Sequence, residues 1–74
     1  MRLDEILSLV LSHDHGCCVI VSKSNGQVCE CSGRAESLLE MIDSKMLTSI
    51  VVAIECRESM LYIEAEMNAN WTRN

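Results

Sequence analysis

Proline and phenylalanine are absent from this sequence, and aromatic residues make up only 3% of its 74 positions. Since 49% of the chain is nevertheless hydrophobic, the core has to be built from Leu, Ile, Val, Met and Cys. No glycine/serine-rich linker, charge-rich linker or low-complexity segment is present, so the sequence indicates no internal domain boundary. A chain of this length forms one small domain with a thin core, and small domains often self-associate.

Basic residues are also scarce. Six lysines and arginines stand against eleven acidic residues, which gives a formal charge of −5 and a pI near 4.8. Binding of long nucleic acid through its phosphates needs a dense basic surface, so the charge argues against that class of function. Arg34, Lys45 and Arg57 are the candidates for holding one small anion, with Arg34 favoured because it begins a predicted helix.

We expect neither a targeting signal nor a membrane-spanning segment. The N-terminus places Arg2, Asp4 and Glu5 before a short apolar stretch, which matches neither a signal peptide nor a membrane helix. Five cysteines are an odd number without a secretion signal, so we expect reduced thiols rather than a disulfide framework. These features predict a soluble, cytoplasmic protein without a membrane partner.

Two segments have the apolar spacing of helices that pack on a core. The first covers residues 3–12, where the apolar positions are Leu3, Ile6, Leu7, Val10 and Leu11. The second covers residues 34–43, where they are Ala35, Leu38, Leu39 and Ile42. We therefore predict two amphipathic helices.

A β-hairpin is predicted over residues 17–31. Its strands flank Asn25-Gly26, and Asn-Gly favours a type I′ turn because both central residues need positive φ. With these two residues as the whole loop, Ile20 pairs with Cys31. That register places five residues on one face: Cys18, Ile20, Ser22, Cys29 and Cys31. The sequence does not decide which face of this hairpin meets the core.

Residues 47–67 form a second hairpin, with two apolar runs on either side of Arg57-Glu58-Ser59. Side chains alternate along a strand, so one almost wholly apolar face carries Ile50, Val52, Ile54, Cys56, Leu61, Ile63, Ala65 and Met67. The opposite, mixed face includes Val51, Ala53, Met60 and Tyr62. We predict this second face, or an edge strand, as the interface of a homodimer or higher homo-oligomer.

The order helix, hairpin, helix, hairpin predicts an α+β fold (αββαββ). Its simplest closed form is a four-stranded antiparallel sheet with both helices on one face. We expect residues 1–67 to form this single domain. The polar residues 68–74 are expected to be a flexible C-terminal tail unless Trp71 docks on the body or on a second subunit.

Imidazoles and thiols are concentrated in the first half of the chain: His13, His15, Cys17, Cys18, Cys29 and Cys31. They are numerous enough for a tetrahedral zinc site, for which His13, His15, Cys18, Cys29 and Cys31 are the candidate ligands. Neither cysteine pair has the spacing of a zinc knuckle, and reduced cysteine packs as a small hydrophobe. We therefore favour core packing without a metal or cofactor, and keep a zinc-binding module as the alternative.

No constellation of residues points to catalysis. His13-Asp14-His15 lacks a pocket and an orienting third residue, and the chain contains no Cys-x-x-Cys motif for thiol redox chemistry. Glu55, Glu64 and Glu66 fit a solvated outer face of a sheet. We predict that the protein is not an enzyme.

The order of these segments resembles that of short proteins encoded by phages and mobile elements. The shared pattern is a leading helix, a strand, an Asn-Gly or Asp-Gly turn, a strand ending in Gly, a short helix and a closing hairpin. The residues that match are Val19-Ile20-Val21, Asn25-Gly26-Gln27-Val28, Gly33-Arg34-Ala35, Leu38-Leu39, Ile50-Val51-Val52 and Leu61-Tyr62-Ile63-Glu64. Some comparably small phage proteins disable bacterial immunity by blocking a defence protein or sequestering its nucleotide signal.

The resemblance, the small size and the acidity predict a non-catalytic binding module encoded by a phage or mobile element. It is expected to act stoichiometrically as a homo-oligomer, in the cytoplasm of a bacterial host. Its ligand is expected to be a host defence protein or a small nucleotide signal. The resemblance carries no binding residue over to this chain.

Overall fold

The computed structural model describes residues 1–11, 16–23 and 25–67. The predicted tail at 68–74, with Trp71, and the candidate ligands His13 and His15 lie outside the described residues. The helices are α1 (Leu3–Leu9), α2 (Ala35–Met41) and α3 (Ser44–Leu47); the strands are β1 (Cys17–Ser22), β2 (Val28–Gly33), β3 (Ile50–Arg57) and β4 (Met60–Glu66). Within these ranges, no helix has the length and apolarity to cross a membrane.

The four strands form one mixed sheet with the order β2-β1-β4-β3. β1 pairs antiparallel with β2, and β3 pairs antiparallel with β4, so both predicted hairpins form. The hairpins join through β1 and β4, which run parallel. The predicted α+β class and four-stranded sheet are confirmed, whereas the prediction that the sheet is wholly antiparallel is wrong.

Burial in the strands follows the strand order, with β1 and β4 at the centre of the sheet. Four of the six residues of β1 are buried, and β4 carries the buried Ile63 and Ala65, whereas most of β3 is exposed. The chain passes from β2 through α2 and α3 before it enters β3. Such a helical crossover returns the chain to the same end of the sheet, so β2 and β3 point the same way. Their inner partners β1 and β4 are therefore parallel.

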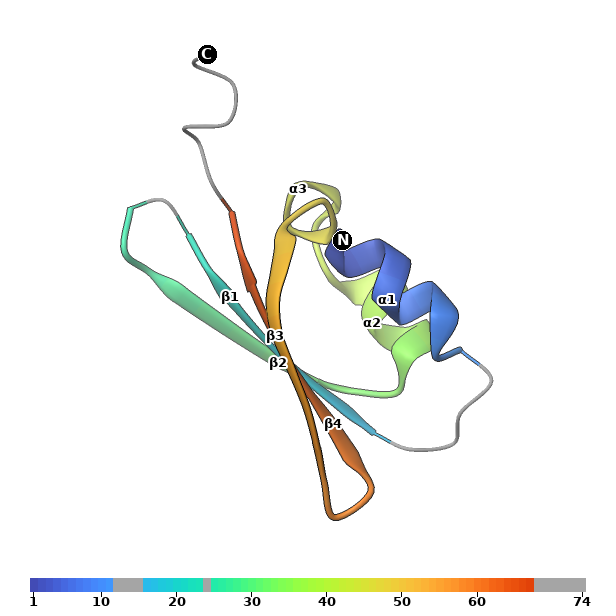
Figure 1. The fold of residues 1–74 in the computed structure, drawn as a ribbon. Helices are drawn as coiled ribbons and strands as arrows, with labels where there is room; N and C mark the ends of the chain where they lie inside the picture. Colours follow the sequence, from blue (N-terminus) through green and yellow to red (C-terminus); the bar gives the residue numbers. More distant parts are fainter. Residues whose placement is uncertain (12–15, 24, 68–74) are drawn as a thin grey trace.

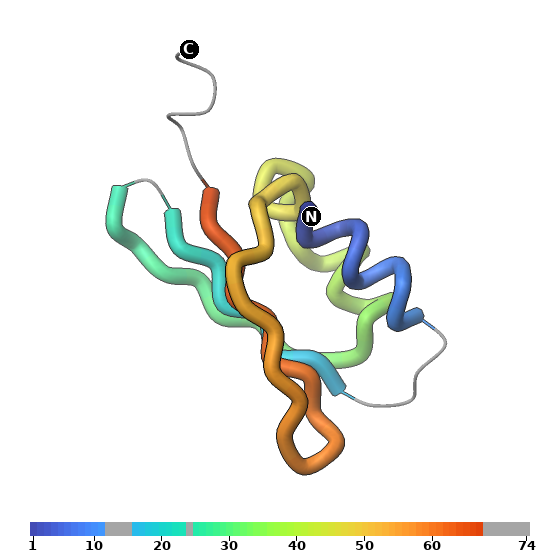
Figure 2. The backbone as a smooth tube through the Cα atoms, viewed as in Figure 1, coloured from blue at the N-terminus to red at the C-terminus, as the bar shows by residue number. Residues whose placement is uncertain are grey.

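The core lies between the helices and the sheet. Figures 1 and 2 show α1 and α2 on the same side of the sheet, and α1 contacts α2. The buried core side chains are Leu3, Leu7, Cys17, Val19, Val21, Ala35, Leu38, Ile42, Ile63 and Ala65. These are aliphatic and cysteine side chains, as the composition predicts.

The first hairpin has a longer loop than the Asn-Gly turn predicts. The N–H of Lys23 donates to the carbonyl of Gln27 at 2.7 Å, so these two residues close the hairpin and the loop between them has three residues instead of two. The resulting register pairs Cys18 with Ser32, Val19 with Cys31, Ile20 with Glu30 and Val21 with Cys29. This is one residue away from the predicted register, and a one-residue shift moves every side chain of a strand to the other face. Cys29 and Cys31 consequently lie on the helix-covered side, away from Cys18.

A β-bulge in β3 interrupts the period-two pattern of the second hairpin. Val51 faces Ala65 and Ala53 faces Glu64, so Val52 is an extra residue between them. Val51 packs against the core on the helix-covered side, whereas Ala53 shares the other side with Glu64. The prediction that Val51 and Ala53 lie on one face is therefore wrong.

The residues before α1 pair with the start of β3 as a very short strand. The N–H of Val51 donates to the carbonyl of Met1, and the N–H of Leu3 donates to the carbonyl of Ser49, both at 2.8 Å. These bonds hold the first turn of α1 against the beginning of β3. They also occupy the outer edge of β3 only at that end.

Candidate functional site

The helices leave one side of the sheet uncovered in the described part of the chain (Figure 1). Since alternate residues of a strand point to opposite faces, the strand register defines which residues lie there. We call this surface the open face, and it consists of Cys18, Ile20, Ser22, Val28, Glu30, Ser32, Ile50, Ala53, Glu55, Arg57, Met60, Tyr62, Glu64 and Glu66.

Apolar side chains occupy the middle of the open face. Ile20 lies on β1, and Met60 and Tyr62 lie on β4; all three are half-buried. Cys18 faces Tyr62 across the parallel pair of strands. A tyrosine with an apolar ring and a polar hydroxyl is typical of protein-binding surfaces.

Carboxylates surround this apolar middle. Glu30, Glu55, Glu64 and Glu66 are all exposed on the open face. In one row across the sheet, Ile20 lies between Glu30 and Glu64, at one strand spacing of about 4.8 Å from each. Arg57 is the one lysine or arginine in the four strands. The open face therefore presents a negative potential around an apolar centre.

Arg57 lies at the end of β3 beside the turn. Its guanidinium carbon is 4.5 Å from the centroid of the Tyr62 ring, and its Nε lies 3.2 Å from a carboxylate oxygen of Glu55. The side chains of both partners in the ion pair are more than half exposed, so water screens the pair and it stabilises the fold little.

Cys18 is the buried thiol of the open face. Its Sγ donates a hydrogen bond to Oε2 of Glu30 at 3.6 Å. Burial raises the pKa of Cys18, and the hydrogen bond and negative charge of Glu30 raise it further. The thiol therefore stays protonated at neutral pH, and a protonated thiol is a poor nucleophile. This arrangement argues against thiol chemistry at the open face.

The structure brings together three of the four residues predicted for the oligomer interface. Ala53, Met60 and Tyr62 all lie on the open face. Val51 lies on the other side because of the β-bulge. Glu55, Glu64 and Glu66 form part of the exposed surface of the sheet, as expected for a solvated face.

The three cations predicted to hold an anion lie on different parts of the molecule. Arg34 is the N-cap residue of α2, Lys45 lies in α3, and Arg57 ends β3. α3 precedes the start of β3, and Arg57 lies at its far end, so a strand of eight residues separates Lys45 from Arg57. At about 3.3 Å per residue, this length is too great for both to contact one small anion.

The candidate zinc ligands within the described residues are also separated. Cys18 lies on the open face, whereas Cys29 and Cys31 pair with Val21 and Val19 on the helix-covered side. In the ranges that the structure describes, no three His, Cys, Asp or Glu side chains are grouped closely enough to hold a metal. The prediction that these three cysteines share a face is wrong, because the loop of the hairpin is longer than two residues.

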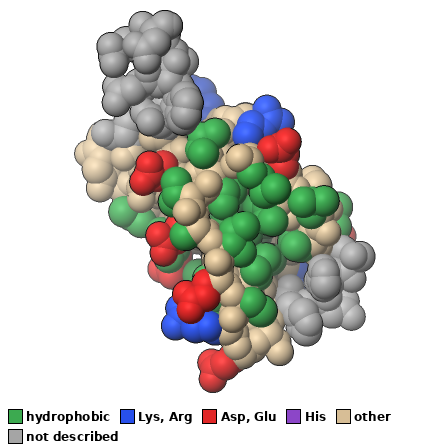
Figure 3. Space-filling view, viewed as in Figure 1, with side chains coloured by type: hydrophobic (Ala, Val, Ile, Leu, Met, Phe, Trp, Pro, Cys, Tyr) green, Lys and Arg blue, Asp and Glu red, His purple; other side chains and the backbone are tan. Residues whose placement is uncertain are grey.

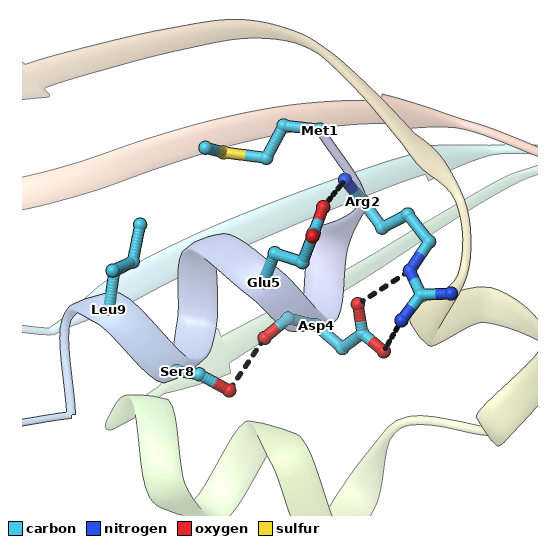
Figure 4. A pocket seen from close by; sticks show the side chains of 6 residues that line it. All are labelled: Met1, Arg2, Asp4, Glu5, Ser8 and Leu9. Carbon is cyan, nitrogen blue, oxygen red and sulfur yellow. Dashed lines mark hydrogen bonds and ion pairs between the residues drawn. The ribbon is translucent and has the colours of Figure 1, made fainter.

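A hollow of about 450 Å³ lies along α1, and Figure 4 shows the side chains around it. Its lining residues are Met1, Arg2, Asp4, Glu5, Ser8 and Leu9. The backbone N–H of Arg2 donates to Glu5 at 2.8 Å, its guanidinium contacts Asp4 at 3.2 Å, and Ser8 donates to the Asp4 carbonyl at 2.8 Å. Because these polar groups already bond one another, the hollow offers a ligand few unpaired partners.

Local sequence patterns do not group Ile20, Glu30 and Glu64 on one surface, although the three lie in one row of the sheet. A signal was present in the second strand, where Glu30 stands between two cysteines. A carboxylate is far more costly to bury than a thiol, so the face of Glu30 is the one that meets water. This rule identifies the water-facing side of the second strand, but it places Ile20 beside Glu30 only in the observed register, which the longer loop creates.

No protein-family model, curated protein or solved structure matches this chain.

Proposed function

We propose that the chain is a non-catalytic binding module whose open face docks on another protein in a stoichiometric complex. The observation that carries this proposal is the apolar patch of Ile20, Met60 and Tyr62 with exposed carboxylates around it. Protein-binding surfaces commonly combine an apolar, aromatic centre with a polar rim. An uncovered sheet offers such a centre without any rearrangement of the fold.

The carboxylates around the apolar centre indicate which charge the binding surface of the partner carries. Glu30, Glu64 and Glu66 complement a protein surface with lysine and arginine around an apolar centre. Complementary charges accelerate association and make it sensitive to salt. The partner is therefore a protein with a basic patch.

The same charges favour a protein over a nucleotide as the ligand. The carboxylates repel phosphate groups from the open face, and Arg34, Lys45 and Arg57 do not surround a common point. The resemblance to short phage proteins adds a target class, namely a bacterial defence protein in the cytoplasm of the host. Sequestration of a nucleotide signal is the competing outcome of the experiment below.

A pair of charge-reversal variants tests the role of the open face. Glu30→Lys with Glu64→Lys reverses two charges beside Ile20, and Glu36→Lys with Glu40→Lys makes the same change on exposed positions of α2. Tagged protein is used to capture a partner from bacterial lysate, and the purified pair is measured by titration calorimetry. Circular dichroism checks that each variant is folded.

We expect one-to-one binding that the open-face variant weakens by about tenfold or more, with a smaller salt dependence. The α2 variant is expected to bind like the parent. Equal effects of the two variants, or none, would contradict the proposal. A rise in melting temperature with a nucleotide, in a thermal-shift screen of the parent protein, would instead identify the nucleotide as ligand.

A further inference from the structure

The hydrogen bonds of β4 show which backbone groups of β3 point outward. The N–H of Leu61 donates to the carbonyl of Gly16 at 3.0 Å, on the side of β1. Backbone hydrogen bonds alternate between the two sides of a strand, so Leu61 and Ile63 bond towards β1 and not towards β3. Cys56 and Ile54 lie opposite them in β3. These two residues therefore direct their N–H and C=O groups away from β4.

The outward groups of Ile54 and Cys56 lie on a free edge in the described part of the chain, because β3 stands last in the strand order. From Val52 to Cys56 the sequence has neither proline nor lysine, the residues that commonly keep an edge strand unpaired. Such an edge is a template for a further strand, which would supply the missing backbone partners.

The start of the same edge already carries a short strand. The residues before α1 pair antiparallel with the beginning of β3, and the carbonyl of Met1 accepts a hydrogen bond from the N–H of Val51 at 2.8 Å. Ile54 and Cys56 follow along the edge, after the β-bulge. A strand that bonds to them would continue the line that Met1 begins.

On the helix-covered side, this edge is apolar. Ile54 and Cys56 lie opposite Ile63 and Leu61, so their side chains point to that side. Nevertheless, Ile54 is 47% exposed and Cys56 is exposed as well. Figure 3 shows hydrophobic side chains gathered where β3 and α1 face the viewer. Every second side chain of an added strand would meet this surface, and an apolar one would remove it from water.

On the open face, the same edge is acidic. Glu55 lies in β3, and Glu64 lies in β4 opposite Ala53; both carboxylates are exposed. Arg57 offsets one of these charges. A lysine or arginine opposite Glu55 would form an attractive cross-strand pair, and one opposite Ala53 would extend over its methyl group towards Glu64. The edge therefore complements a strand in which basic residues alternate with apolar ones.

The edge strands of a second copy do not have this pattern. β2 contains no lysine or arginine, and β3 contains only Arg57, at its end. The chain as a whole carries a formal charge of −5. Charge complementarity therefore favours a segment of another, basic protein.

We propose that the basic partner of the open face also adds an extended segment to β3, as a further strand bonded to Ile54 and Cys56. Its basic residues face Glu55 and Glu64, and the apolar residues between them cover Ile54 and Cys56. This proposal deepens the function proposed above and rests on it, since it names the element with which the same partner binds.

A synthetic peptide of alternating lysine and valine, long enough to span Val52 to Arg57, tests the added strand. The control peptide has the same composition with all lysines before all valines, so the two carry equal charge. Fluorescence anisotropy of the labelled peptides, titrated with the full chain, measures their affinities. We expect the alternating peptide to bind at least about tenfold more tightly, because only its residues match both sides of the edge.

Amide hydrogen exchange of the parent protein locates the bound peptide. The N–H groups of Ile54 and Cys56 are expected to exchange at least about tenfold more slowly with the alternating peptide, because they gain partners. Glu55 and Arg57 alternate with them and bond towards β4, so their N–H groups are expected to change less. Binding to the open face alone would not produce this alternation.

Ile54→Pro and Ile54→Ala form a matched pair of variants. Both shorten the apolar side chain, but only proline removes the outward N–H. Since this N–H does not bond to β4, proline at this edge position is compatible with the hairpin, and circular dichroism checks the fold. We expect the proline variant to bind the alternating peptide at least about tenfold more weakly than the alanine variant. If the proline variant does not fold, the exchange measurement on the parent decides.

Equal affinities of the two peptides, equal affinities of the two folded variants, or unchanged exchange at Ile54 and Cys56 would overturn the added strand. If Glu30→Lys with Glu64→Lys still weakens binding of the peptides, the open face binds basic partners and only the edge proposal fails. If it does not, both proposals fail. Slow exchange at Ile54 and Cys56 without peptide, together with a dimer in analytical ultracentrifugation, would identify a second copy as the occupant and would also overturn the proposal.

Discussion

Glu58 and Ser59 form the tight turn between β3 and β4 with φ angles of 51° and 68°. Two successive residues with positive φ define a type I′ turn, for which Asn-Gly is the preferred sequence. An L-residue other than glycine loses about 1–2 kcal/mol in this region of backbone space. Glu58 and Ser59 therefore adopt a backbone conformation that their own residue types disfavour, because the tight turn of the hairpin requires it.

Replacing this pair is expected to stabilise the protein. Glu58→Asn with Ser59→Gly relieves the strain and is expected to raise the free energy of unfolding by about 1 kcal/mol. For a domain of this size, that gain raises the melting temperature by about 4–8 °C, measured by calorimetry. Ser37→Gly in α2 is the matched control, and it should lower stability because glycine disfavours helix. A loss of stability from the turn variant would contradict this reading of the turn.

The buried thiols predict how stability depends on pH. Burial raises the pKa of Cys17, and burial together with Glu30 raises the pKa of Cys18, above the ordinary thiol value of 9.0. The unfolded thiols therefore ionise first as the pH rises, so the unfolded state loses protons that the folded state keeps. The contribution of these thiols is fully present below pH 9 and is lost as the pH rises through the folded pKa values.

Urea unfolding at several pH values measures this effect. The free energy of unfolding is expected to decrease above pH 9 more steeply for the parent than for Cys18→Ala, which lacks one of the two raised thiols. Equal slopes for the two proteins would show that Cys18 does not titrate in the expected way. Iodoacetamide at mildly alkaline pH supplies an independent check, since Cys56 is expected to react well before Cys17 and Cys18.

At the scale of elements, the hairpins and two helices followed from local sequence patterns. The spacing of Leu3, Ile6 and Leu7 marked α1, and that of Ala35 and Leu38 marked α2. α3 was not predicted because four residues are too few to show a helical period. Its start is fixed by Asp43, whose side chain accepts a hydrogen bond from the N–H of Lys45 at 3.1 Å.

The residues that were predicted on the wrong face of the sheet were misplaced for one physical reason, a shift of the strand register. Alternation predicts which residues share a face only when the register is continuous. The three-residue loop between Lys23 and Gln27, one residue longer than predicted, and the extra residue Val52 each shift the register by one. Ala53, Met60 and Tyr62 lie after the bulge and were grouped correctly, whereas Val51 lies before it and was not. A local pattern does not reveal a bulge, because the bulge depends on the partner strand.

Side chains are more buried in the central strand β4 than in the edge strand β3, so the same substitution in the two strands is expected to have different effects on stability. Ile63 in β4 is fully buried, whereas Ile54, its neighbour across the pair in β3, is 47% exposed. Ile63→Ala is expected to lower the free energy of unfolding by about 2–5 kcal/mol. Ile54→Ala makes the same chemical change and should lower it by less than about 1 kcal/mol. Chemical denaturation of dilute protein measures both, and similar losses would contradict the assignment of β3 as the edge.

At the scale of the whole molecule, the direction of the strands was the feature that the sequence did not reveal. The apolar periodicity of a strand indicates which of its faces is buried. It does not indicate whether the adjacent strand runs parallel or antiparallel to it. Apolar content does not reveal the order either, since β3 has six apolar residues out of eight and still lies at the edge. The buried strand residues lie in β1 and β4.

Hydrogen exchange is expected to reproduce this order of burial. Amides of β1 and β4 are expected to exchange most slowly, through global unfolding, because both strands have neighbours on two sides. The outward amides of β2 and of β3 beyond Val52 should exchange faster by local opening. Two-dimensional NMR after transfer to deuterated water gives the rates. Edge amides as slow as the central ones in a verified monomer would contradict the strand order.

The parallel pair of β1 and β4 has a consequence for how the chain is made. β1 leaves the ribosome early, but its central partner begins at Met60. At a synthesis rate of about 5–20 residues per second, β1 waits roughly 2–8 s for that partner. During this interval the valines and cysteines of β1 have only β2 beside them, so the nascent chain exposes the apolar residues of β1 until β4 emerges.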